Sequence, residues 1–151
     1  MALNPNQFRQ TPEVGYLDLQ TGLNNVLTCI HLAGETTPLK PGQAVKLVDN
    51  YTAIPSVEDS AITEVALGVV VNNLKDADFP AEARLEVARV GTVMFMQASA
   101  AIARGANVQY DPSTNKVATK ASTNGILGQA LDKAGANNDI IRVIINPASG
   151  A

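Results

Sequence analysis

The chain has few of the residues from which most catalytic and metal-binding sites are built. Its 151 residues include one cysteine, Cys29, one histidine, His31, and no tryptophan. A single cysteine excludes an intrachain disulfide, and a single histidine excludes a histidine-rich metal site within one chain. The sequence also lacks a phosphate-binding loop of the form GxxxxGK[ST], an HExxH and a CxxC. We therefore expect a protein that is not an enzyme and that uses no cofactor and no metal.

The cysteine and the histidine lie two residues apart in the apolar run VLTCIHL, so a strand would place them on one face. A cysteine nucleophile needs a nearby base, an orienting acid and a donor group for the oxyanion. No motif for the last two accompanies Cys29. We interpret Cys29 as a small buried residue of a strand, and a nucleophile served by His31 is the alternative.

Two groups of acidic residues are the remaining candidates for a cation site. Glu58 and Asp59 are adjacent, and Asp76 and Asp78 lie close together in a polar segment. Carboxylate oxygens of this kind can hold a hard cation. Neither group has the ligand spacing of a known cation-binding loop, so we interpret all four side chains as solvated surface charges.

Charged and aromatic residues are also scarce. Asp, Glu, Lys and Arg make up 17% of the chain, against about 25% in a typical soluble protein. The formal net charge is -3 and the basic residues are scattered singly, whereas nucleic-acid binding requires a basic patch. Aromatic residues, at 4%, are too few for a base-stacking platform. We expect no nucleic-acid partner, and the low charge favours a surface that is partly covered by other subunits.

Long apolar runs are absent as well. No run approaches the roughly 20 apolar residues that cross a membrane as a helix. The start, MALNPNQFRQ, has no basic segment followed by an apolar core, so it does not resemble a secretory signal. We expect a soluble protein with no membrane partner, synthesised in the cytoplasm.

Residues 1–25 differ in character from the rest of the chain. They are rich in Asn and Gln, they contain two prolines and two glycines, and they sustain neither helical nor strand periodicity. We predict an extended N-terminal arm. A solvated tail usually carries many charges and few large apolar groups, but this segment has five that we take as candidate partner-binding anchors: Leu3, Phe8, Tyr16, Leu17 and Leu19. The arm would lie either on a neighbouring subunit or along the edge of its own domain's sheet.

Residues 26–151 show the pattern of a single β domain. Short apolar or alternating runs recur between glycine, proline and asparagine turns, which is typical of an all-β barrel or sandwich. The predicted strands are 26–32, 44–48, 62–71 with an interruption at Gly68, 85–96 with a bend near Gly91, 107–111, 116–118, 125–131 and 139–145. The run QASAAIAR, at 97–104, is compatible with one helical turn.

Two halves of this domain repeat a small sequence pattern approximately. Each half has a glycine before an alternating strand and a later Leu-Gly pair, and the matching positions are Gly42 with Gly105, Val45 with Val108, and Gly68 with Gly128. We expect positive φ at Gly42 and Gly105, which stand in turns. We expect Gly68 and Gly128 to let a strand bend or another backbone approach closely. A chance recurrence of glycine, turn and strand is the alternative explanation.

The second half also resembles a known family. The run LEVARVGTVMFMQASAAIARGANVQYDPSTNKVATKASTNGILGQALDKAGANNDIIRVII looks like the core of the tailed-phage capsid decoration, or cement, proteins. Residues 39–71 resemble the early part of the same family. The resemblance implies a compact β-tulip-like barrel and a structural virion protein on the outer face of the capsid, made in the host cytoplasm.

The resemblance further implies that the protein binds the outer surface of the expanded shell. It would stabilise the shell by bridging neighbouring major capsid proteins, as a homotrimer. Two other functions remain open. One is a head-fibre base or a carbohydrate-binding module of the virion surface, which exposed aromatics in a concave pocket would favour. The other is an enzyme whose site is shared between subunits.

Overall fold

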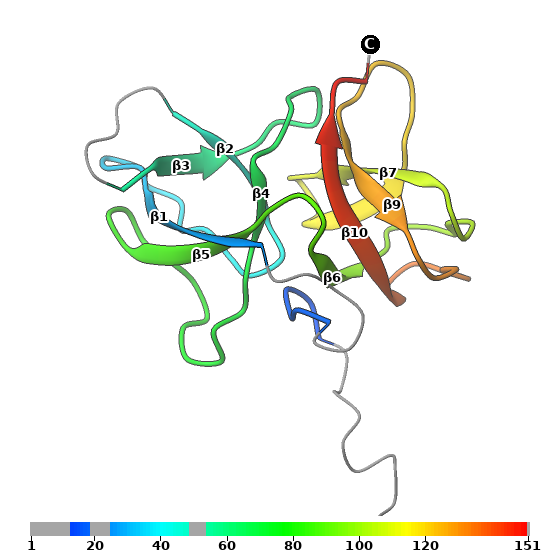
Figure 1. The fold of residues 1–151 in the computed structure, drawn as a ribbon, viewed down its shortest axis with the longest axis horizontal. Helices are drawn as coiled ribbons and strands as arrows, with labels where there is room; N and C mark the ends of the chain where they lie inside the picture. The colour runs from blue at the N-terminus through cyan, green and yellow to red at the C-terminus, as the bar shows by residue number, and fades with distance from the viewer. Residues whose placement is uncertain (1–12, 19–24, 49–53, 151) are drawn as a thin grey trace, which may run out of the picture.

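The structure is a computed structural model that describes residues 13–18, 25–48 and 54–150. Within these ranges it contains strands and no helix, arranged as two bodies side by side (Figure 1). The strands are β1 (Val26–His31), β2 (Ala44–Leu47), β3 (Ser56–Asp59), β4 (Gly68–Val70), β5 (Arg84–Ala88), β6 (Val93–Gln97), β7 (Asn107–Asp111), β8 (Lys116–Thr119), β9 (Ile126–Ala130) and β10 (Ile140–Ala148). The predicted all-β fold with a barrel is confirmed.

The first body is a closed barrel in the order β1-β3-β2-β4-β5, with β5 pairing back onto β1. Parallel pairing of β1 with β3 closes the ring, and the other neighbours are antiparallel. Alternate residues of these strands point inward, as the period of a strand requires. Together with Leu39 and Phe79, which form an isolated bridge outside the strands, they make one buried apolar cluster: Cys29, Leu39, Val45, Val57, Val70, Phe79, Leu85 and Val87.

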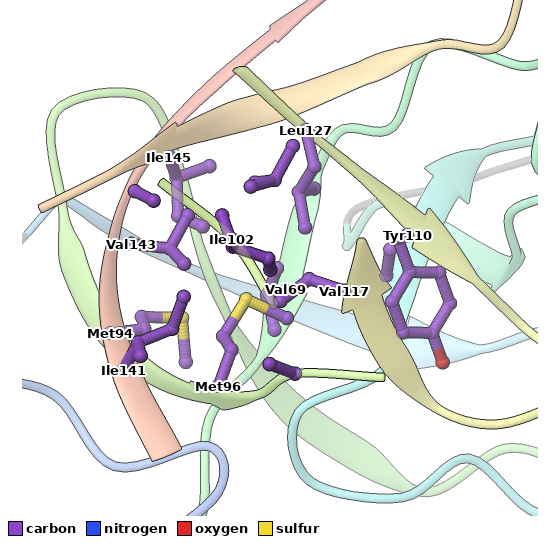
Figure 2. Close-up of a cluster of buried hydrophobic side chains, with 14 of the residues drawn as sticks. Val69, Met94, Met96, Ile102, Tyr110, Val117, Leu127, Ile141, Val143 and Ile145 are labelled. Carbon is purple, nitrogen blue, oxygen red and sulfur yellow. The ribbon is translucent and has the colours of Figure 1, made fainter. Parts of the chain in front are cut away.

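The second body is a five-stranded sheet in the order β6-β10-β9-β7-β8. An isolated parallel bridge between Ala98 and Val117 connects the end of β6 to β8. The apolar side chains inside it form the larger cluster, part of which is drawn in Figure 2. Ala44, Val69 and Ala88 of the first barrel belong to this cluster too, so the larger cluster packs the two bodies against each other.

The two bodies pair their strands in matching registers. Val45 lies opposite Gly68 in the first body and Val108 lies opposite Gly128 in the second. The other matching pairs are Leu47–Val57 with Tyr110–Val117, the parallel His31–Val57 with Ala98–Val117, and the bridges Leu39–Phe79 with Ile102–Ala134. We infer that β1–β5 and β6–β10 repeat one topology, so the turns at Gly42 and Gly105 are equivalent corners.

Most of the predicted strands are present, and the differences have physical causes. The predicted strand at 85–96 is two strands in different bodies, because the chain turns at Gly91, where φ is +88°. Of the predicted strand at 62–71, only Gly68–Val70 forms a strand, which is β4. Its first part is a turn in which the Ala61 N–H donates to the Glu64 carboxylate, 2.8 Å away.

Two further differences concern short elements. Residues 98–104 form no helical turn, because isolated bridges at Ala98 and Ile102 hold this segment in an extended course. The strand β3 was not predicted, because its sequence, SVED, contains a single apolar residue. It becomes a strand because both neighbours, β1 and β2, offer backbone partners.

Candidate functional site

The candidate nucleophile and base are enclosed in the first barrel. Cys29 is fully buried and His31 nearly so, and the His31 ring shares a hydrogen bond of 2.9 Å between Nδ1 and the Phe79 carbonyl oxygen. Burial, with a smaller contribution from Glu86, raises the pKa of the Cys29 thiol to about 11. A protonated thiol without access to solvent is not a nucleophile, so the interpretation of Cys29 as a buried strand residue is confirmed.

The acidic residues are held by neighbouring polar groups. Lys46 Nζ lies 3.3 Å from Glu58 and 2.6 Å from Glu64, and Gln43 Nε2 donates to Asp59 Oδ1 over 2.9 Å. In the described ranges no three side chains of His, Cys, Asp or Glu are grouped to hold a metal ion. No helix in the same ranges is long and apolar enough to cross a membrane.

Residues 13–18 of the N-terminal arm lie along the free edge of β6. The Gly15 N–H donates to the Phe95 carbonyl, the Phe95 N–H donates to the Tyr16 carbonyl, and the Asp18 N–H donates to the Val93 carbonyl, at 2.8–2.9 Å. Tyr16 and Leu17 are half-buried, and Leu17 packs against the larger core. The other arm candidates, Leu3, Phe8 and Leu19, lie outside the described residues.

The same segment also contacts the first barrel, at a corner formed by Gly42 and Asn72. The Asn72 N–H donates to the Gly15 carbonyl over 2.9 Å. Gly15 has φ +82° and Gly42 has φ +84°, and a Cβ on Gly42 would stand 2.3 Å from Cγ1 of Val14. Glycine at position 42 therefore lets the turn form and lets the N-terminal segment pack on it.

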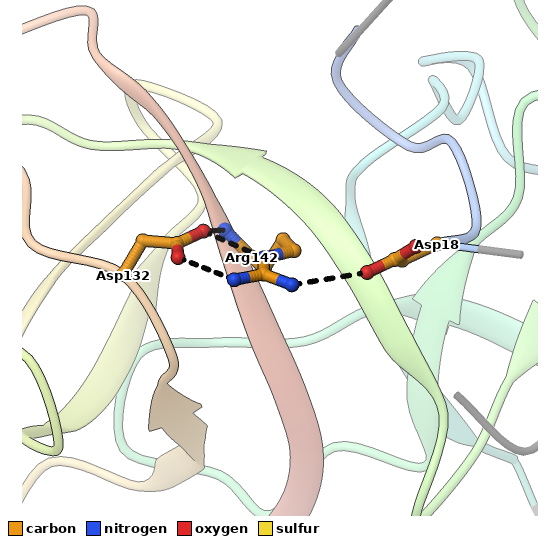
Figure 3. A network of polar contacts seen from close by, with 3 residues as sticks. All are labelled: Asp18, Asp132 and Arg142. Carbon is orange, nitrogen blue, oxygen red and sulfur yellow. Dashed lines mark hydrogen bonds and ion pairs between the residues drawn. The ribbon is translucent and has the colours of Figure 1, made fainter. Parts of the chain in front are cut away.

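A polar network fixes residues 13–18 to the second body, as Figure 3 shows. The guanidinium of Arg142, on β10, donates to both oxygens of Asp132, from Nε at 2.9 Å and from Nη2 at 2.7 Å. The third guanidinium nitrogen, Nη1, lies 3.5 Å from Asp18 Oδ2. The hydrogen bonds and charge of Arg142 hold the pKa of Asp132 below its ordinary value. In turn the Asp132 carboxylate, with a smaller contribution from Asp18, raises the pKa of Arg142.

This network predicts a pH-dependent contribution to stability. Because the folded-state pKa of Asp132 is depressed, its contribution is present above the unfolded pKa and is lost as pH falls through the folded pKa. We expect Asp132→Asn to lower the free energy of unfolding at pH 7 by about 1 kcal/mol, a value reduced for the partial exposure of the pair. Urea denaturation of both proteins checks this. The difference should shrink below about pH 4, near the reference pKa of Asp, and an equal difference at pH 7 and pH 3 would contradict it.

The β4–β5 loop carries the most exposed large apolar side chain among the described residues. Leu74 is 77% exposed and has φ +66°, a left-handed conformation that costs a leucine roughly 1 kcal/mol or more. Asn side chains hold the loop in this shape. The Leu74 N–H donates to Asn72 Oδ1, and Asn73 Oδ1 accepts from the Asp76 N–H, each over 2.9 Å. The loop is a preformed tip that presents one leucine to solvent.

Comparison of the two bodies shows that this tip is additional to the shared topology. Phe79 lies nine positions after Val70, whereas its counterpart Ala134 lies four positions after Ala130 (79-70 = 9 and 134-130 = 4). The second body thus makes the same bridge with five fewer residues. Sequence reasoning treated the segment as an exposed polar loop and missed Leu74, because the equivalence of Phe79 with Ala134 is visible only in the pairing.

The sequence comparison identifies the family. Residues 29–145 match the family described as phage cement protein. The chain belongs to the phage cement protein family. This cement protein is accordingly a structural protein of the virion's capsid surface, and the family match spans strands of both bodies. The comparison with curated protein sequences gives no match.

The cement protein also resembles a solved structure. The head fiber gp8.5 N base of bacteriophage phi29 superposes with a TM-score of 0.56 at 12% sequence identity, over 80% of this chain and 92% of that chain. At this identity the likeness shows a common fold. It indicates that the arrangement of two strand bodies occurs in another phage head protein.

Proposed function

We propose that this cement protein binds the outer surface of the expanded phage capsid and stabilises the shell by bridging neighbouring major capsid proteins. The observation that carries the proposal is the fixed root of the N-terminal arm. Residues 13–18 are held by backbone hydrogen bonds to β6 on one side and to Asn72 on the other. The chain before Glu13 therefore starts from a defined place on a rigid β body.

Residues 1–12 supply the contacts with the capsid in this proposal. Twelve residues precede Glu13, and an extended chain covers about 3.3 Å per residue, so they span up to about 40 Å. Leu3 and Phe8 are the large apolar residues along this stretch that we propose as anchors in the capsid. Their burial in a neighbouring protein would resist separation of the capsid subunits that they join.

A homotrimer would strengthen such attachment. Once the first subunit of a trimer is bound, the others bind from a high effective concentration, which raises avidity by about 10²–10⁴. A stable contact between subunits buries roughly 800 Å² on each partner. The low charge of the chain, 17%, supports a surface that is partly covered in this way.

The proposal is tested by adding the purified protein to empty heads of its own phage. Expanded and unexpanded heads are incubated with the protein, sedimented and analysed for the bound amount. We expect saturable binding to expanded heads, weak binding to unexpanded heads, and a higher temperature of disruption for the coated shells. Equal binding to both forms, or no binding, would refute the proposal.

A head-fibre base is the second candidate, and the likeness to the phi29 head fiber base favours it. A carbohydrate-binding module of the virion surface belongs to the same alternative. In both alternatives the protein binds the head, and its outward face additionally binds a fibre protein or a glycan. A glycan array, or a search for a fibre protein that binds coated heads, separates them from cement alone. Stiffening of the shell without any further ligand favours cement.

A further inference from the structure

The two bodies have equivalent corners, but one leads into a projecting loop and the other is hollow. In the first body the corner at Gly42 and Asn72 is covered by Val14 and Gly15, and the chain extends from it into the tip that presents Leu74. The second body has its corner at Gly105, whose N–H donates to the Ala130 carbonyl over 2.8 Å just as Gly42 donates to Val70. One corner thus carries a projection.

The corner of the second body is hollow instead. Apart from Gly105 and its two chain neighbours, no described residue lies within 4 Å of where a Cβ on Gly105 would stand. The hollow has a volume of about 290 Å³ and its lining consists of Arg104, Gly105, Gln129, Ala130, Leu131 and Arg142. The exposed surface of its lining is mostly apolar, and the lining includes two arginines, Arg104 and Arg142. It therefore suits an apolar side chain that is accompanied by a carboxylate.

We propose that the Leu74 tip of one copy inserts into the Gly105 hollow of a second copy. The tip carries both groups that suit the hollow, an apolar side chain and carboxylates, because Leu74 is followed by exposed Asp76 and Asp78. At the rim, Arg142 is already bound to Asp132 and Asp18. Arg104 lies close enough to Asp132 for their charges to interact, but it makes no ion pair within the described part of the chain, so we assign it as the partner of Asp78.

The geometry of the tip favours this contact. Its hydrogen-bonded asparagines fix the loop before binding, so little conformational entropy is lost on insertion. The tip and the hollow belong to different bodies of one chain, so the contact is heterologous. Such a contact forms a ring when its rotation closes and an open filament when it does not. A ring of three copies would be the homotrimer of the proposed function, so the number three rests on that proposal. The contact between two copies does not depend on capsid binding.

Charge reversal and apolar truncation test the contact in solution. We expect sedimentation velocity to show the wild-type protein above monomer mass at high concentration. Leu74→Asp should weaken association by at least about ten-fold, as loss of a central apolar anchor does. Val90→Asp is the matched control, because Val90 is an apolar residue of 50% exposure elsewhere on the surface. It should associate like the wild type.

Arg104→Glu and Asp78→Arg should each weaken association, and the double variant should recover it. Cross-linking gives an independent readout: Leu74→Cys protein mixed with Gln129→Cys protein should form a disulfide-linked pair, while buried Cys29 stays unreactive. A monomeric wild type that gives no cross-link, or Leu74→Asp protein that associates normally, overturns the proposal. Sedimentation with expanded heads is scored separately, since failure of head binding with intact self-association contradicts the capsid function and leaves the contact standing.

Discussion

Gly128→Ala is expected to destabilise the protein by about 3 kcal/mol or more, at or above the upper end of the usual cost of overpacking. A Cβ on Gly128 would stand 2.0 Å from the Ile144 carbonyl oxygen. The position of this Cβ is fixed by the backbone of β9, and the carbonyl belongs to the backbone of β10. Both strands are paired within the sheet, so neither group can move aside as a flexible side chain would. Gly68 is in the same position in the first barrel, where a Cβ would stand 2.0 Å from the Ala88 carbonyl oxygen, and Gly68→Ala should behave alike.

Gly105→Ala is the matched control for this prediction, because it adds the same methyl group to a glycine without a clash. Gly105 has φ +83° and open space around its Cβ position, so only the left-handed conformation is penalised, by roughly 1–2 kcal/mol. Urea denaturation of the three variants gives the comparison. Gly128→Ala protein that unfolds at the wild-type urea concentration would show that β9 and β10 do not approach as closely as described.

Deletion of residues 1–12 is expected to leave a folded protein that attaches poorly to expanded heads. The cut falls before Glu13, so the hydrogen bonds of Gly15, Tyr16 and Asp18 to β6 are retained. We expect the apparent affinity for heads to fall by at least about 30-fold, which corresponds to one lost apolar anchor of about 2 kcal/mol. Thermal unfolding shows whether the fold survives, and quantitative sedimentation with heads gives the affinity.

Point variants separate the anchors from the length of the arm. Leu3→Ser together with Phe8→Ser should reproduce most of the loss, whereas Asn4→Ser together with Gln10→Ser should not. Both double variants keep the arm at full length and retain Arg9. Normal occupancy of the shell by the truncated protein would refute the role of the arm, and equal effects of the two double variants would refute the role of its apolar residues.

Much of the fold is predictable from local sequence patterns. The alternating runs at Ala44–Leu47 and Asn107–Asp111 become β2 and β7, and their preceding glycines have positive φ. The repeated glycine pattern indicates two related halves from the sequence alone. These features are local, because turn residues and the period of a strand are determined by neighbours in the chain.

The features that were missed depend on contacts between distant residues. β3 is polar in sequence and exists because two other strands pair with it. The network of Asp18, Asp132 and Arg142 joins residues separated by up to 124 positions, and no local motif marks it. Leu74 stands out as a projecting side chain only when the longer loop is compared with its shorter counterpart in the second body.

The most direct test of the capsid function is a cryo-electron microscopy map of expanded heads saturated with this protein. We expect added density on the outer surface, with the two β bodies recognisable and the chain before Glu13 running from the β6 edge into contact with the major capsid protein. Density confined to the inside of the shell, or a body attached with residues 13–18 facing away from every capsid subunit, would contradict the account.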